Sequence, residues 1–231
     1  DPALEANYRD EVFEVEAPFS GEGKSLVKTI NRFSGIDWGT ENTAIVYDYW
    51  WDTRNRKAYV FNPSNSTSKP KVLYDRNYQD IYSDPGSFLK TRNTFNKSVL
   101  MLYKGNAYLR GAGFSKEGQF PFIDKLNITT LNKSRVYQSK YTDKVEAIQD
   151  YNPSTNELIV RIESPTEYPN YYSKKTNGKK LSKITHFENP FEELQNVKKE
   201  VITYKRDDGL ELSGILYLPV NYDEEKKEKA P

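Results

Sequence analysis

The sequence predicts an all-β protein, an incomplete β-propeller of about three four-stranded blades. Apolar residues recur at every second position in short runs, which is the period of a half-buried strand. Gly, Asn, Pro, Asp or Ser separate these runs, and helical patterns are nearly absent. The runs also group in fours at a spacing of about 45 residues, which is typical of propeller blades. The alternative is a β-sandwich, whose strands have similar spacing without grouping in fours.

The expected strands follow one another in a regular order. Residues 11–17 and 25–30 precede the regular groups and resemble the end of an earlier unit. The first full group occupies residues 32–76. Its strands are expected near residues 35–38, 43–51, 57–62 and 71–74. The second group, residues 96–139, and the third, residues 144–187, each contain candidate strands in the same fourfold pattern.

Two segments in the middle of the chain stand out from this pattern. Residues 76–95, which include Asp84-Pro85-Gly86, predict a loop of about twenty residues, and loops of that length are usually functional or disordered. Residues 98–103 have apolar side chains at both odd and even positions, and therefore on both faces of a strand. That pattern favours a central strand covered on each face by another sheet.

The strand pattern stops after residue 187. Residues 188–199 are expected to be a linker, with one helical turn near 191–195. Two strand-like runs then flank Asp207-Asp208-Gly209, which predicts a hairpin because Asp-Gly supplies the positive φ angles of a tight turn. Residues 222–231 are mostly charged and are expected to form a solvated loop. The predicted division is a partial propeller, a linker and a separate hairpin unit, at residues 1–187, 188–199 and 200–231.

Charge and composition exclude several classes of function. The 231 residues contain 34 Lys and Arg against 33 Asp and Glu, a net charge of +1, so no nucleic-acid partner is expected. No apolar run approaches the roughly 20 residues of a membrane helix, so no membrane partner is expected either. Without cysteine and with His186 alone, neither a metal site nor a cofactor is expected. No signal peptide is visible, and the compartment is not predicted.

The sequence offers little catalytic chemistry of its own. A hydrolase serine nucleophile needs the pentapeptide GxSxG, which is absent. The nearest segment, residues 113–118, is one residue too long and is expected to be a turn between strands. His186 is expected to be structural or partly exposed rather than catalytic. Tyr47, Tyr49 and Trp51 share one strand face and could stack on a sugar, so a carbohydrate-binding or protein-interaction β-module is the alternative function.

Seven segments, taken together in order, resemble the prolyl oligopeptidase family of serine peptidases. They are Ala17-Pro18-Phe19, residues 32–39, Tyr49-Trp50-Trp51, Asp84-Pro85-Gly86 with Thr91-Arg92-Asn93, residues 163–172, Thr185-His186-Phe187, and residues 204–209 leading into 216–219. The branch that they resemble most is that of the glutamyl endopeptidases and their bacterial relatives. The resemblance covers nearly the whole chain.

The resemblance implies a seven-bladed propeller followed by a C-terminal α/β-hydrolase domain that holds the catalytic triad. This chain would stop before the triad and would be an inactive fragment of a bacterial peptidase. Its parent would be an exported or periplasmic protein. The implied partners are a peptide substrate, reached through the parent enzyme, and the hydrolase domain. Open blades expose uncovered strands and faces, so self-association is also expected.

Arginines are the candidate substrate contacts that the resemblance suggests. If the parent cleaves after glutamate, a cation must face the substrate carboxylate, and a guanidinium can bind it through two parallel hydrogen bonds. Arg92, Arg54 and Arg32 lie in family-like segments. Arg92 is the first choice because it lies on the long loop.

Overall fold

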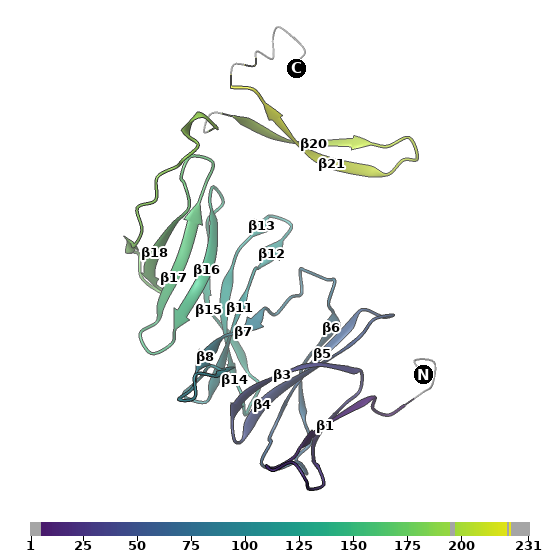
Figure 1. The fold of residues 1–231 in the computed structure, drawn as a ribbon. Helices are drawn as coiled ribbons and strands as arrows, with labels where there is room; N and C mark the ends of the chain where they lie inside the picture. Colours follow the sequence, from purple (N-terminus) through teal and green to yellow (C-terminus); the bar gives the residue numbers. More distant parts are fainter. Residues whose placement is uncertain (1–5, 195–196, 221, 223–231) are drawn as a thin grey trace.

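The computed structural model describes residues 6–194, 197–220 and 222, and in these residues it is an all-β structure (Figure 1). A single turn of 3-10 helix, η1 at Glu192–Leu194, lies where one helical turn was predicted. No helix in the described part of the chain is long and apolar enough to cross a membrane. Residues 195–196 of the expected linker and 223–231 of the expected charged loop lie outside the described residues.

Three antiparallel sheets make up most of the structure. The first sheet contains, in order, β3 (Arg32–Thr40), β4 (Thr43–Trp50), β5 (Asn55–Phe61) and β6 (Lys71–Asn77). The second sheet contains β10 (Leu102–Tyr103), β11 (Asn106–Gly111), β14 (Phe122–Asn127) and β15 (Lys133–Gln138), and β7 (Ser87–Phe88) also pairs with β11. The third sheet contains β16 (Val145–Asn152), β17 (Glu157–Glu163), β18 (Asn170–Lys175) and β19 (Leu181–Lys183). The predicted grouping in fours is therefore present, with β7 as a fifth strand that the prediction did not include in the second sheet.

Four smaller hairpins complete the fold of the described residues. They are β1 (Asp10–Glu14) with β2 (Lys24–Thr29), β8 (Lys90–Arg92) with β9 (Ser98–Leu100), β12 (Phe114–Ser115) with β13 (Gly118–Gln119), and β20 (Lys198–Lys205) with β21 (Glu211–Leu218). The β12–β13 pair contains the turn expected at residues 113–118, and the Ser115 hydroxyl donates to the Gly118 carbonyl at 3.1 Å. This serine is part of a tight turn between strands.

The core consists of apolar layers between successive sheets. The layer between the first and second sheets contains Ile45, Ala58, Phe88, Leu100, Ala107, Leu109 and Leu126. The layer between the second and third sheets contains Leu89, Tyr108, Ile123, Tyr137, Ile148, Tyr151, Leu158, Val160 and Ile162. Successive side chains of a strand point to opposite faces, so β11 directs Ala107 and Leu109 into one layer and Tyr108 into the other. A third layer joins the β1–β2 hairpin to the opposite face of the first sheet.

The structure corrects two predictions in the segment before β11. Residues 76–95 are not one long loop, because they contain β7, which pairs with β11, and β8, which pairs with β9. Residues 98–103 are not one central strand. They divide into β9 and β10, which belong to different sheets, and β10 is an edge strand. Strands of two or three residues are too short to show an alternating pattern in the sequence.

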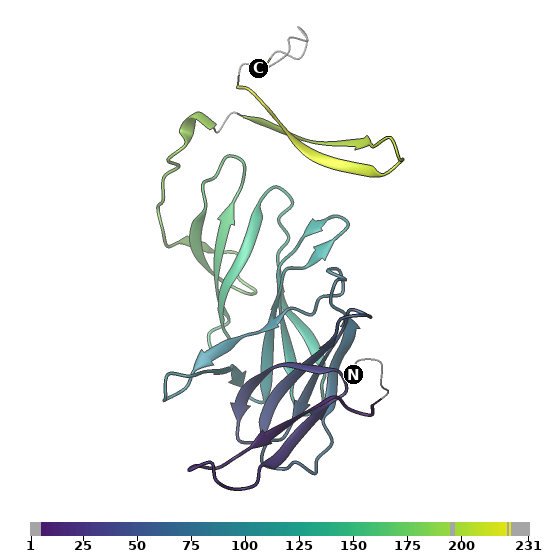
Figure 2. The same ribbon diagram turned by 45° about the vertical axis from the view of Figure 1, so that its right-hand side comes forward.

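The β20–β21 hairpin is present where Asp207-Asp208-Gly209 predicted it, with Gly209 at φ +86°. In Figures 1 and 2 it lies apart from the three sheets. Both of its faces carry exposed apolar side chains. Val201, at 76% exposure, is paired with Ile215 on one face, and Tyr204 and Leu216 lie on the other.

A charged group is buried between the second and third sheets. Glu146 on β16 is 2% exposed, and its carboxylate accepts hydrogen bonds from the Tyr137 hydroxyl at 2.6 Å and from Lys174 Nζ at 3.1 Å. Lys174 Nζ also donates to the Tyr137 hydroxyl at 2.8 Å. Burial, reinforced by Glu146, raises the pKa of Tyr137 above its ordinary range. The Lys174 ammonium is the cation that compensates the buried carboxylate.

We expect Lys174→Met to lower the free energy of unfolding by about 3 kcal/mol, because the buried Glu146 carboxylate loses its cation. Lys175→Met is the matched control, since Lys175 and Glu157 are both exposed and lie 3.6 Å apart. The control should cost less than about 0.5 kcal/mol. Urea unfolding followed by circular dichroism measures both changes. Equal losses for the two variants would show that the buried pair has no special role.

Candidate functional site

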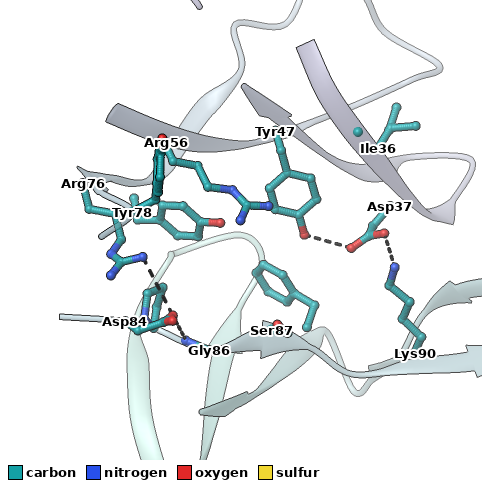
Figure 3. A pocket seen from close by; sticks show the side chains of 14 residues that line it. Ile36, Asp37, Tyr47, Arg56, Arg76, Tyr78, Asp84, Gly86, Ser87 and Lys90 are labelled. Carbon is teal, nitrogen blue, oxygen red and sulfur yellow. Dashed lines mark hydrogen bonds and ion pairs between the residues drawn. The ribbon is translucent and has the colours of Figure 1, made fainter. Parts of the chain in front are cut away.

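A cavity of about 360 Å³ lies between one face of the first sheet and the segment that leads into β7 and β8 (Figure 3). Its wall on the sheet side comes from β3, β4, β5 and β6, and the opposite wall comes from residues 84–90. Part of the segment that was predicted to be one long loop therefore forms one wall of this cavity. Its lining contains three cationic side chains and two carboxylates, in addition to tyrosine hydroxyls.

Strand register determines which side chains enter the cavity. Ala58 on β5 is paired with Tyr47 on β4 and with Tyr74 on β6, so these three side chains form one row across the sheet. Two residues along the same strands, Arg56 is paired directly with Arg76 and continues the same face. Ala58 lies between Tyr47 and Tyr74 in their row. Because its side chain is only a methyl group, it leaves the space between the two tyrosine rings open.

At one end of the cavity the polar groups satisfy each other. The Tyr47 hydroxyl donates to Asp37 Oδ2 at 2.8 Å, and Lys90 Nζ lies 2.6 Å from Asp37 Oδ1. Burial, together with the adjacent Asp37 carboxylate, raises the pKa of the Tyr47 phenol well above its ordinary range. Lys90 and Asp37 also connect the two walls of the cavity.

At the other end, Arg76 is held by the segment that follows β6. Its guanidinium donates to the Ser83 hydroxyl at 3.4 Å and to the backbone carbonyl of Asp80, and it lies 4.0 Å from Asp84 Oδ1. The same Asp84 oxygen accepts the backbone N–H of Gly86 at 2.8 Å. The position of the Arg76 side chain is therefore fixed by several contacts.

Gly86 allows the wall segment to lie against the second sheet. Its φ is +84°, and a Cβ built there would lie 2.4 Å from the Arg110 carbonyl oxygen of β11. The Arg110 guanidinium in turn donates to the carbonyls of Ile148 and Gln149 in the third sheet, at 3.0 and 2.6 Å. Only glycine fits this conformation and this close approach.

Arg56 and Tyr74 occupy the middle of the cavity. The Arg56 guanidinium lies 5.4 Å from the centre of the Tyr47 ring, and Figure 3 shows it directed toward that ring. Burial raises the pKa of the Tyr74 phenol, while the positive charges of Arg56 and Arg76 act in the opposite direction. Both guanidinium groups are therefore within electrostatic range of the Tyr74 hydroxyl.

The three arginines singled out in the sequence lie at separate places, and none of them lines this cavity. Arg92 donates to the Asn96 carbonyl at 2.8 Å within its own hairpin, and Arg32 pairs with Asp10 at 2.9 Å. Arg54, at φ +56°, stacks over the Trp51 ring at 4.0 Å and donates to the hydroxyl of Tyr78, a lining residue, at 3.4 Å.

The three aromatic residues that could stack on a sugar lie in different surroundings. Tyr47 is half-buried and directed into the cavity. Tyr49 is 39% exposed, and Trp51 lies beyond the end of β4, is 65% exposed and is stacked with Arg54. Of the three, Tyr49 and Trp51 are therefore the ones that solvent reaches. His186 follows β19 in the chain and is exposed.

Comparison with known proteins identifies relatives of the chain. No family model matches it. It is 32% identical, over its whole length, to a protein named as a probable chloroplastic glutamyl endopeptidase of Arabidopsis thaliana. It is 34% identical, over 96% of its length, to the protein of the same name from Oryza sativa subsp. japonica. The chain spans 26% of the length of each.

Solved structures give a looser similarity. A protein assigned as a dipeptidyl aminopeptidase IV from Bacteroides ovatus aligns with 92% of this chain and 38% of its own, at 16% identity and a TM-score of 0.46. TolB from Acinetobacter baumannii aligns with 94% of this chain and 48% of its own, at 13% identity and a TM-score of 0.38.

The structure defines an all-β protein of stacked antiparallel sheets, two with four strands and one with a fifth strand, β7, added to its four. Over its full length the chain is homologous to the glutamyl endopeptidases of the prolyl oligopeptidase family, as the sequence motifs suggested.

We expect the stability of the protein to fall with pH above about 10, the ordinary pKa of tyrosine. The raised pKa of Tyr47 keeps its phenol protonated in the folded state while the unfolded chain ionises. Its contribution is therefore fully present below about pH 10 and is lost as the pH rises beyond it, by up to about 1.4 kcal/mol per pH unit. Urea unfolding at several alkaline pH values measures the slope. Tyr47→Phe should make the slope less steep, and other buried tyrosines such as Tyr137 account for the rest. Tyr82→Phe, at an exposed position, should leave the slope unchanged. Equal slopes for both variants would contradict the assignment.

Proposed function

We propose that the chain is the non-catalytic, propeller part of a serine peptidase of the prolyl oligopeptidase family. The observation that carries the proposal is the full-length homology to glutamyl endopeptidases, of which the chain spans 26%. In this proposal the sheets are propeller blades that form one wall of a chamber and admit only short or unfolded peptides. Acyl transfer by a Ser-His-Asp triad takes place in a hydrolase domain outside these 231 residues.

We also propose the division into a partial propeller at residues 1–187, a linker at 188–199 and the first hairpin of the hydrolase domain at 200–231. The exposed apolar side chains on both faces of the β20–β21 hairpin support it, since Val201 and Ile215 on one face and Leu216 on the other need a cover. An isolated two-stranded hairpin is only marginally stable in water. The hydrolase domain would supply that cover.

Self-association of the 231-residue chain belongs to the same proposal. In a closed propeller each blade is covered by its neighbours. Exposed apolar side chains also occur around the third sheet, at Val145, Leu181 and Ile184. In the chain alone, a second copy would cover these surfaces in place of the missing neighbours.

The 231-residue chain should hydrolyse no peptide, whereas the full-length protein that contains it should hydrolyse short peptides with a glutamyl residue before the scissile bond. The physical reason is that the sequence contains no GxSxG nucleophile motif. A chromogenic peptide assay on both proteins tests this expectation. Turnover by the pure 231-residue chain would refute the proposal, and so would an inactive, correctly folded full-length protein.

Arg92 remains our proposed propeller contact for the substrate carboxylate, with Arg54 and Arg32 as weaker candidates. In the full-length enzyme, Arg92→Ala should lower kcat/KM for a glutamyl peptide about tenfold, the loss expected for one charge-assisted hydrogen-bonding contact. Lys97→Ala, in the same hairpin, is the charge-matched control. If the two variants have the same kcat/KM as the wild type, Arg92 does not contact the substrate.

A further inference from the structure

We propose that the cavity of the first sheet binds a small carboxylate between Arg56 and Arg76. This inference concerns a binding site in the chain itself and holds whether or not the chain belongs to an active peptidase. It rests on the strand register, on the distribution of charge in the cavity and on the donors that face it.

The register places the backbones of two cationic residues directly opposite each other. Arg56 on β5 and Arg76 on β6 are partners in the antiparallel pair, with no bulge between them. Directly opposed side chains have Cβ atoms about 5 Å apart, and like charges at such positions destabilise a sheet. A carboxylate bound between the two guanidinium groups would replace this repulsion by two attractive interactions.

The carboxylates of the cavity leave one of these cations without an ionic partner. Asp37 is occupied by Tyr47 and Lys90. Asp84 accepts the Gly86 N–H and lies 4.0 Å from Arg76, a long distance for an ion pair. Within the described residues, no carboxylate lies at ion-pair distance from Arg56, whose recorded contact is with the Tyr47 ring.

The donors around this charge suit a planar anion. A guanidinium presents two parallel N–H groups at the spacing of carboxylate oxygens. The contacts of Arg76 to Ser83 and to the Asp80 carbonyl fix its position before any ligand arrives. Tyr74 lines the same cavity.

The size of the cavity limits the ligand. About 360 Å³ lies near the lower end of the range for small-molecule pockets. That volume suits a carboxylate on one or two residues of peptide and excludes a folded domain. The same charge could attract free inorganic phosphate, so the experiment includes both anions.

Isothermal titration calorimetry on the 231-residue chain tests the proposal with two matched probes. They are the N-acetylated amide of glutamate and its neutral isostere, the N-acetylated amide of glutamine. We expect the glutamate probe to bind at least tenfold more tightly. Inorganic phosphate is titrated separately, and tighter binding of phosphate than of the glutamate probe would overturn the assignment to a carboxylate.

Variants of Arg56 test whether the glutamate probe binds in the cavity. Arg56→Gln should weaken the glutamate probe at least tenfold, and Arg56→Lys, which keeps the charge without the planar fork, should weaken it less. Arg161→Gln on β17, where Arg161 pairs with Glu163 at 2.7 Å, is the control and should change binding less than twofold. Circular dichroism confirms that each variant is folded.

Unfolding of the ligand-free protein adds a second measurement. Because Arg56→Gln removes the repulsion from Arg76, the variant should be at least as stable as the wild type while it loses the ligand. Equal binding of the two probes, or wild-type affinity in Arg56→Gln, would overturn the proposal. So would a loss of stability in Arg56→Gln as large as its loss of affinity, because Arg56 would then be a structural residue.

Discussion

The central constraint in this fold is that its first and second sheets are apolar on both faces. The strand β11 shows it most simply, since Ala107 and Leu109 enter one layer and Tyr108 enters the next. A sheet of this kind loses the free energy of apolar burial unless another sheet covers each face. Stacking is therefore required, and any polar side chain inside a layer needs a partner there. Glu146 meets that requirement with Lys174 and Tyr137.

The cavity exists because the apolar layer between the first and second sheets is incomplete at one edge. Ile45 and Ala58 continue the core of the first sheet, but the next cross-strand row contains arginines, which cannot be buried in an apolar layer. The segment 84–90 closes over that row and contributes polar groups. The side chains of the apolar core and those of the proposed anion site thus come from successive cross-strand rows of the same sheet. The strand register that places the core residues also places the arginines.

The sequence was sufficient for the main sheets because their strands are long and separated by turn-forming residues. It was not sufficient for β7 to β10, where strands of two or three residues carry no periodic signal. The arginines chosen from motifs have local partners in the structure, as Arg92 has in its own hairpin. Arg56 and Arg76 could not be recognised, because only the pairing of β5 with β6 places them opposite each other, and the loop between these strands does not determine that register.

Gly86 connects the cavity to the far side of the core through backbone contacts. The wall segment lies so close to β11 that a side chain at position 86 would collide with the Arg110 carbonyl oxygen. The Arg110 guanidinium in turn donates to two backbone carbonyls of β16, the edge strand of the third sheet. The wall that lies beside the first sheet is therefore joined, through Arg110, to the third.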